Sequence, residues 1–378
     1  MRNEKDTNEY KSHLILVVAT LLFGLVVVFK ELVYDVPILL VLLGRFAIAF
    51  IAVLVYVIFR TSRAVNCSTT SGKWEVLKAT MKLKSDDRKI LNHKVLVSLA
   101  GVFFAIHGLF YVWSINVLGG VVTTVWAYLF VQITTIIWDA IIEKKFRNRE
   151  FRLRSLLCLL IVLFALILSS YPLNYGVFVI VGKITTNSGF LFAMLTGIFY
   201  GLRISLNRHI TSSKISDNKN CGLYYSKRQE IVLLYELIVI LTLTGFVVFL
   251  VTVIPSEPIR NSFLPSMGSL RQNTSVLWLF PLGLIATAIP FIMQVKGLSL
   301  SKSSSTASMI LILQVVWGVV FLHLLGIRPS EPSQYIGVAL IILAVAVKAG
   351  FERDVWKYLK LIVESAKKRF TKAKGDKE

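Results

Sequence analysis

Long apolar runs, separated by charged segments and by segments with proline and glycine, follow one another along the whole chain. Each run is about 20 residues long, the length that an α-helix needs to cross the hydrocarbon core of a bilayer. The pattern predicts ten membrane-spanning helices, over residues 14–33, 37–59, 95–118, 120–142, 153–171, 188–210, 230–253, 276–299, 303–325 and 332–350. The first run has no small-residue cleavage site after it, so we expect a retained helix and not a signal peptide.

The composition agrees with this pattern. Of the 378 residues, 55% are hydrophobic and 17% are charged, whereas soluble domains have roughly 45–50% and about 25%. These values exclude a soluble globular protein. The three cysteines are scattered, with no spacing typical of a metal site or a disulfide framework.

The basic residues alternate from one connection to the next. Of the 42 lysines and arginines, 34 fall on one side of the predicted topology. They lie in the N-terminus, in the tail, and in or beside the alternate connections 60–94, 143–154, 208–228 and 300–302. The positive-inside rule then places both termini in the cytoplasm. Because the net charge of +21 is spread over six segments, it does not indicate a nucleic-acid groove. The basic tail either contacts anionic lipid or only fixes the topology.

Five helices per half would make the second half enter the membrane from the opposite side, which gives two inverted repeats. We therefore expect an all-α membrane protein with a cytoplasmic N-terminus over 1–13, a first repeat over 14–171 that includes the basic loop 60–94, a second repeat over 188–350 and a basic tail over 351–378. Weak internal matches support the repeat: the segment around Arg45 parallels the one around Glu236, and Gln132 parallels Gln314.

Several short segments carry a family resemblance. Leu22-Phe23-Gly24, Leu43-Gly44-Arg45-Phe46, the stretch from Gly120 to Lys144 and the stretch from Gly283 to Gly337 resemble the drug/metabolite transporter superfamily in its ten-helix, EamA-like form. The resemblance implies a central cavity lined by helices one to four and six to nine, with helices five and ten at the periphery. It also implies alternating access between the two halves.

Polar and aromatic residues recur at helical spacing inside several predicted spans. Such stripes either line a hydrated cavity that binds a solute or form hydrogen bonds between helices, and we favour the cavity for whole stripes. The stripes comprise Thr196, Tyr200, Arg203 and Asn207; Thr124, Tyr128, Gln132, Thr135 and Asp139; His107, Tyr111 and Ser114; and Thr287, Gln294, Gln314 and Trp317. The candidate substrate-binding residues are Arg203, Glu236, Tyr200, Tyr128, Gln132, His107, Tyr111, Gln294, Gln314, Trp317 and Arg45.

Four ionisable candidates leave alternatives open. Arg203 and Glu236 lie at similar depths, about 10 Å from one end of their helices, and either pair with each other or bind a solute and a coupling proton. Arg45 either supports the architecture or contacts the solute. His107 either titrates in the cavity or is a satisfied core histidine.

Two further patterns concern helix packing. Gly197 and Gly201 form a small-xxx-small motif, which permits close approach of helices within the fold or between chains. Pro281 and Pro290 are expected to bend the helix over 276–299.

The sequence contains no HExxH, GxSxG, Walker A or strand-associated GxGxxG motif. We therefore expect no enzyme activity, cofactor or metal site, and predict a secondary transporter that moves a small organic metabolite by alternating access. Its partners would be the solute, membrane lipid, and protons or a counter-substrate, with no nucleic acid. The alternatives are a phosphorylated-sugar or nucleotide-sugar exchanger, an intramembrane lipid-modifying enzyme, and a receptor or scaffold on a transporter fold. The plasma membrane is favoured and an internal membrane stays open.

Overall fold

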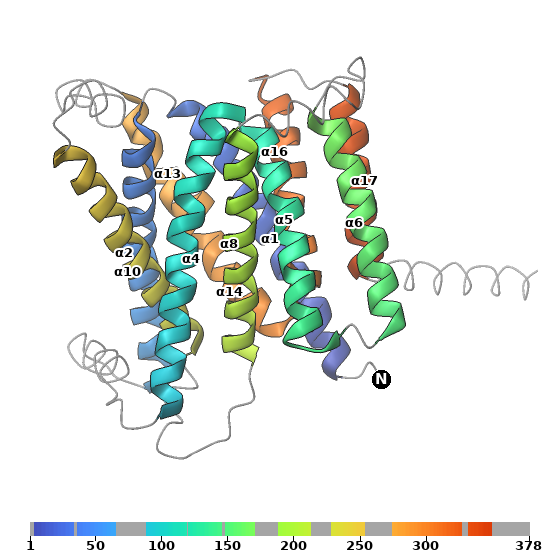
Figure 1. The fold of residues 1–378 in the computed structure, drawn as a ribbon. Helices are drawn as coiled ribbons and strands as arrows, with labels where there is room; N and C mark the ends of the chain where they lie inside the picture. Colours follow the sequence, from blue (N-terminus) through green and yellow to red (C-terminus); the bar gives the residue numbers. More distant parts are fainter. Residues whose placement is uncertain are drawn as a thin grey trace, which may run out of the picture.

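The computed structural model describes residues 4–33, 36–65, 88–118, 120–145, 148–170, 188–212, 228–253, 274–326 and 332–349. Within these ranges helices are the only regular structure, and they stand side by side (Figure 1). The helices are α1 (Glu4–Leu32), α2 (Ile38–Val65), α4 (Arg88–Leu118), α5 (Gly120–Ile141), α6 (Arg149–Ser170), α8 (Ser188–Ser212), α10 (Arg228–Val253), η3 (Thr274–Trp278), α13 (Leu279–Gly283), η4 (Leu284–Ala288), α14 (Ile289–Leu300), α15 (Ser304–Leu311), α16 (Leu313–Leu324) and α17 (Pro332–Ala349). The predicted tail and most of the loop 60–94 lie outside the described residues.

Eight helical segments of the described chain are long and apolar enough to cross a membrane, and a shorter apolar helix covers Tyr335–Ala349. The prediction of an all-α, multi-pass membrane protein is confirmed in this coarser form. Helices lie over each of the ten predicted ranges. The number of spans and the inverted repeat stay predictions.

The surface of the bundle is apolar where lipid would cover it. Leu153, Leu160 and Phe164 on α6, and Phe246 and Phe249 on α10, are all more than half exposed. Soluble monomers rarely expose contiguous apolar patches of this kind, because water solvates them poorly. The exposed side chains are therefore compatible with hydrocarbon as the surrounding solvent.

Several helices are longer than their apolar runs. α1 begins at Glu4 and not near residue 14, α2 continues to Val65, and α4 begins at Arg88. Lysine, arginine and glutamate are good helix formers, so a helix continues past the point where its sequence stops being apolar. Hydropathy marks the hydrocarbon boundary and not the helix end.

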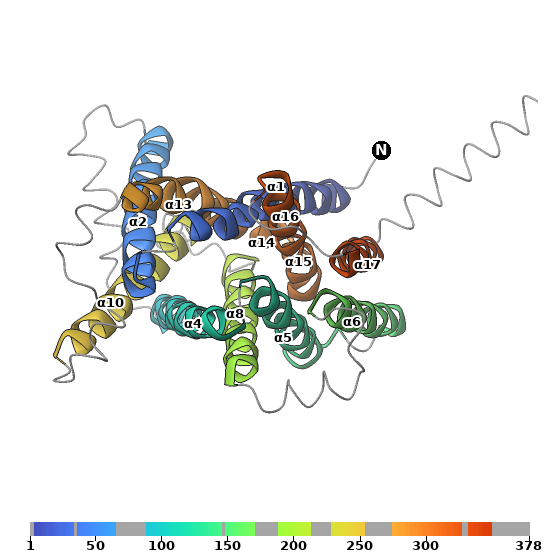
Figure 2. The same ribbon diagram turned by 90° about the horizontal axis from the view of Figure 1, so that it is seen from above.

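α8 and α1 each pack on several other helices of the bundle, which Figure 2 shows from above. α8 packs on α4 and α5, whereas α1 packs on α14 and α16. α6 and α17 pair at one edge of the bundle, where the Cys158 thiol donates to the Ala344 carbonyl over 3.4 Å. α2 and α10 lie together at the opposite edge.

Small residues allow the closest helix approaches. A Cβ atom on Gly197 would lie 2.1 Å from the carbonyl oxygen of Ala127, and one on Gly201 would lie 2.8 Å from the Cβ of Thr134. The small-xxx-small motif of α8 therefore packs on α5 within the fold. Gly24 is similarly close to Trp317, at 2.5 Å for its added Cβ, so α1 and α16 touch through their backbones.

The helix predicted over 276–299 is irregular. It begins with a 3-10 segment, continues through α13, changes to the π-helical turn η4 and resumes as α14. Pro290 lies in the first turn of α14 and lacks the N–H that would close a regular α-helical bond. The Thr287 hydroxyl donates to the Leu282 carbonyl over 2.7 Å across this turn. π-helical turns are frequent at functional sites.

Candidate functional site

A cavity lies among α1, α2, α4, α5, α8 and α16, and encloses about 70 Å³, which is room for a few water molecules. Six of its lining residues carry the argument below, and all but the first have aromatic rings: Arg45, Phe104, His107, Tyr111, Tyr128 and Tyr200. The candidate Gln314 also lines it. The lining includes no residue of α6 or α17, which fits the peripheral place implied for the fifth and tenth helices, and none of α10 or α14.

The cavity lies away from the end of the bundle at which the chain begins. α2 and α5 start at the far end, and they contribute residues between 42 and 46 and between 124 and 131, from their earlier parts to the middle. α1 and α4 finish at the far end, and they contribute residues 23–27 and 104–111 from their later parts.

Three residues of α4 form a ladder of rings along the cavity wall. Phe104, His107 and Tyr111 lie three and four residues apart on one helix face, and successive ring centroids are 5.8 Å apart. The Tyr200 ring stacks on His107 with a centroid distance of 4.5 Å. Phe291 continues the ladder beyond Phe104 at 5.7 Å. Aromatic rings thus form a large part of the cavity wall.

His107 is held by the backbone of α8. Its Nδ1 lies 3.1 Å from the Thr196 carbonyl oxygen. Because a carbonyl oxygen only accepts hydrogen bonds, Nδ1 carries the hydrogen, and the Nε2 of the neutral ring is then an acceptor. The ring is thereby fixed in both position and tautomer.

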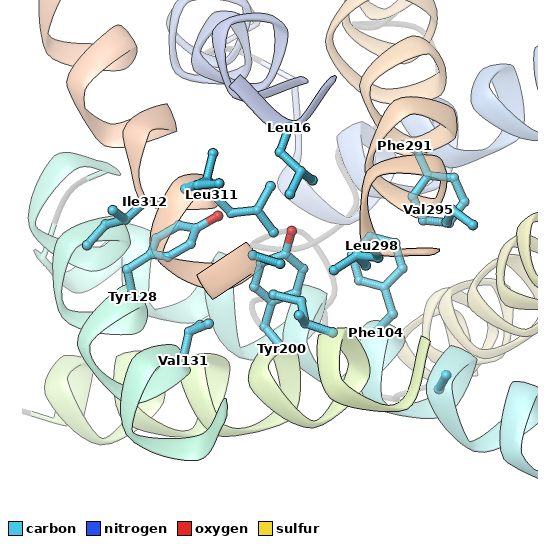
Figure 3. Close-up of a cluster of buried hydrophobic side chains, with 14 of the residues drawn as sticks. Leu16, Phe104, Tyr128, Val131, Tyr200, Phe291, Val295, Leu298, Leu311 and Ile312 are labelled. Carbon is cyan, nitrogen blue, oxygen red and sulfur yellow. The ribbon is translucent and has the colours of Figure 1, made fainter. Parts of the chain in front are cut away.

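The three tyrosine hydroxyls of the cavity differ in their partners. Tyr111 pairs with the Thr124 hydroxyl at 2.8 Å, and the Tyr200 hydroxyl accepts from Gln294 Nε2 at 2.9 Å. The Tyr128 hydroxyl is buried close to the Tyr200 hydroxyl and has no hydrogen-bond partner within 3.5 Å in the described part of the chain. Figure 3 shows Tyr128 reaching from α5 and Tyr200 from α8 into one region beside Leu16, with the two hydroxyls at its border.

Arg45 is the one arginine or lysine among the described residues that line the cavity. Its Nε donates to the Thr287 hydroxyl over 2.6 Å, so the side chain is anchored to the π-helical turn η4. Its guanidinium carbon lies 5.4 Å from the Phe46 ring centroid. Among the residues that the structure describes, no carboxylate forms an ion pair with Arg45.

Arg203 and Glu236, by contrast, form a buried ion pair behind the cavity wall. Arg203 Nε and Nη2 donate to the two carboxylate oxygens of Glu236 over 3.0 and 3.1 Å. Asn207 donates to the same carboxylate over 2.8 Å, and Arg203 Nη1 donates to Gln294 over 3.3 Å. The guanidinium also lies 3.7 Å from the Phe104 ring centroid. Of the two alternatives, the structure shows the pair, and neither Arg203 nor Glu236 lines the cavity.

The polar stripe of α5 divides between two surroundings. Thr124 and Tyr128 line the cavity. Gln132 lies outside the lining, where its Oε1 accepts from Ser308 over 3.2 Å. Asp139 accepts from the backbone N–H groups of Ser304 and Ser305 over 3.2 and 2.9 Å, and so caps α15. The lower part of the stripe joins helices, because α15 packs against α5 at that level.

Trp317 and Gln294 also lie outside the lining. Trp317 stacks on Phe321 with a centroid distance of 6.3 Å and packs on Gly24. Gln294 accepts from Arg203 and donates to Tyr200. It therefore contacts a cavity-lining residue without lining the cavity itself.

A second polar cluster joins segments at the end of the bundle where α1 begins, which is the lower end in Figure 1. We call it the latch, and it comprises Glu9, Glu143, Lys145, Arg208 and Lys302. Arg208 pairs with Glu143 and donates to the Lys302 carbonyl over 2.5 Å. Glu143 also pairs with Lys145, whose ammonium donates to the same carbonyl over 2.5 Å, and Lys302 pairs with Glu9. The latch therefore joins α1 and the end of α5 to α8 and the α14–α15 connection.

Sequence reasoning did not find the latch or Phe104. Lys145, Arg208 and Lys302 lie in or beside the basic connections, so the sequence analysis counts them only as topology signals. The sequence does contain one sign of an ion pair: the acidic Glu143 lies among lysines and arginines. Phe104 lies three residues before His107 on the same helix face, so the ring ladder was visible in the spacing.

Comparisons with known proteins identify the fold and nothing finer. No family model matches the chain, and no curated protein matches its sequence. A solved structure described only as "Crystal structure of protein" is 15% identical, with a TM-score of 0.58, over 90% of this chain and 98% of that chain. This similarity shows a shared fold over nearly the whole chain.

Proposed function

We propose that this protein is a secondary transporter that moves a small organic solute across a membrane by alternating access. The observation that carries the proposal is a polar and aromatic cavity in one half of the bundle, with the latch closing the other end. A transporter needs both parts, since the solute must bind within the membrane while one path to it is closed.

The proposal includes the finer topology predicted from the sequence. Ten spans form two inverted five-helix repeats of the EamA-like kind, both termini are cytoplasmic, and the latch faces the cytoplasm. The cavity then lies in the outer half of the membrane. In this arrangement the structure represents a state with the inner path closed.

The latch has the composition expected of a gate between two halves. Glu9, Glu143 and Lys145 belong to the first half of the chain, and Arg208 and Lys302 belong to the second. The Lys302–Glu9 pair is partly exposed, at 49% and 27%, and such a pair contributes only about 0–1 kcal/mol. The Arg208–Glu143 pair is more buried, at 10% and 14%, so it would hold the latch until the halves move. The buried pair of Arg203 and Glu236 lies within the second half and would move as one unit with it.

The test is uptake by sealed proteoliposomes that contain the purified protein and no nucleotide. The vesicles are incubated with a mixture of metabolite classes, and their contents are identified by mass spectrometry. A transporter fills the vesicles with an unchanged solute, whereas an intramembrane enzyme yields an altered solute or lipid. Phosphorylated sugars entering in exchange for phosphate would favour the exchanger alternative. No entry of any class into vesicles that contain folded protein would contradict the proposal.

A further inference from the structure

The cavity carries an unbalanced positive charge. Arg45 lies seven residues into α2, about 10 Å along its axis, and the cavity lining contains no aspartate or glutamate among the described residues. Its Nε is bound to the neutral Thr287 hydroxyl. An ionised side chain within the membrane is costly unless it has a partner or water. The site therefore lacks a counter-charge that a bound solute can supply.

The N–H groups of Arg45 that do not bond Thr287 determine which anionic group fits best. Since Nε already donates to Thr287, the remaining donors are the N–H groups of the two Nη atoms. Two parallel N–H groups on one edge match the two oxygens of a carboxylate. A lysine ammonium in this place would offer a point charge without that directional match.

The rest of the cavity fits a flat organic body with a polar group at its far end. The ring ladder of Phe104, His107 and Tyr111 offers aromatic surface. Tyr128 is only 2% exposed and lines the cavity, and its hydroxyl, although close to that of Tyr200, has no hydrogen-bond partner within 3.5 Å in the described chain. A buried hydroxyl without a hydrogen bond is destabilising, and a ligand group that bonds it removes that cost.

We infer that the cavity binds a small organic monocarboxylate, with its carboxylate on the Nη edge of Arg45. Its planar body lies along the ring ladder, and a polar substituent reaches the Tyr128 hydroxyl. The inference rests on the proposed function, because it names the solute class of the same cavity. A single carboxylate is selected, since one guanidinium balances one negative charge and the described residues of the lining include no lysine.

The experiment measures binding to the purified full-length protein in detergent by isothermal titration calorimetry. The probes share one ring and differ in charge: benzoate, the neutral benzamide, the cationic benzylamine and the dianionic phenyl phosphate. Benzoate is expected to bind about 10- to 100-fold more tightly than benzamide, the range for a hydrogen-bonded charge. Benzylamine is expected to be weaker still, and phenyl phosphate weaker than benzoate.

Variants assign this preference to Arg45. Arg45→Gln should bind benzoate and benzamide about equally, and Arg45→Lys should keep part of the preference. Lys348→Met is the matched control, because it removes a buried cation that lies outside the cavity, on α17. It should keep the full preference for benzoate.

The inference is overturned if the native protein binds benzamide or benzylamine as tightly as benzoate, or binds no probe. It is also overturned if folded Arg45→Gln keeps the preference. Should Arg45→Gln fail to fold, the probe series on the native protein decides. Carboxylate binding without uptake by proteoliposomes would reject transport and keep the anion site. Uptake confined to neutral or cationic solutes would reject the anion site and keep transport.

Discussion

Arg203 on α8 and Glu236 on α10 form two parallel hydrogen bonds, over 3.0 and 3.1 Å, although 33 residues separate them in sequence. Both side chains are essentially fully buried, at 1% and 0% exposed. The pair thus connects two helices of the second half directly behind the ring ladder of the cavity.

Breaking this pair is expected to cost more stability than removing it entirely. Arg203→Met or Glu236→Gln alone leaves the other group buried without its partner, which costs about 3–5 kcal/mol. The double variant should recover much of that loss. Thermal unfolding in detergent, followed by fluorescence-detected gel filtration, measures the three variants against the native chain.

Two outcomes would conflict with this account of Arg203 and Glu236. Additive losses in the double variant would show that the two groups do not stabilise each other. A stable double variant that has lost all solute binding would show that the pair contacts the solute directly.

Filling the cavity tests its role without altering a polar group. A Cβ atom on Gly108 would meet only one atom, the Cδ2 of Leu42 at an ordinary 3.8 Å, and Gly108 lines the cavity. Gly108→Val should therefore fold and reduce solute uptake strongly, because its methyl groups occupy the solute space. Uptake and folded yield are measured together in proteoliposomes.

Gly245→Val on α10 is the matched control. An added Cβ there meets no atom within 4 Å, and Gly245 does not line the cavity. Its uptake should equal that of the native protein. Equal uptake by both valine variants would remove the cavity from the solute path.

Gln132→Leu is expected to leave uptake nearly unchanged. Gln132 lies outside the cavity lining, and its Nε2 is buried without a partner in the described chain. Ser308 keeps its bonds to Thr135 and to the Ser305 carbonyl when Gln132 is lost. Stability should change by less than about 1 kcal/mol, since removing an unsatisfied group offsets the lost bond. A selective loss of uptake at normal folded yield would instead place Gln132 in the solute path.

The sequence predicted the helices better than the contacts of their polar faces. Apolar runs located every helix range, and the spacing of Thr124, Tyr128, Gln132 and Asp139 correctly placed them on one face of α5. That face borders the cavity at one level and meets α15 at another. The same helical spacing therefore produces residues that line the cavity and residues that bond a neighbouring helix. Periodicity alone does not distinguish the two groups.

Long-range pairings had no local signal. Arg45 and Thr287 are 242 residues apart and meet at the irregular turn η4. Pro290 indicated an irregular helix. Which residue bonds to the irregular turn depends on how α2 packs against it. The latch similarly depends on four segments that come together only in the folded bundle.

The central claim is that the cavity opens to each side of the membrane in turn. A single cysteine at Val131, which lines the cavity and is 1% exposed, reports access when the three native cysteines are replaced. Valine and cysteine have similar volumes, so Val131→Cys should fold. The latch variant Arg208→Met is made in the same background.

The deciding measurement is the rate at which a membrane-impermeant thiol reagent modifies this cysteine from each side of oriented proteoliposomes. Alternating access predicts modification from both sides. It also predicts that Arg208→Met raises the rate from the latch side and lowers it from the opposite side, because breaking the latch shifts the population toward the inward-open state. Modification from one side only, unchanged by Arg208→Met, would contradict the account.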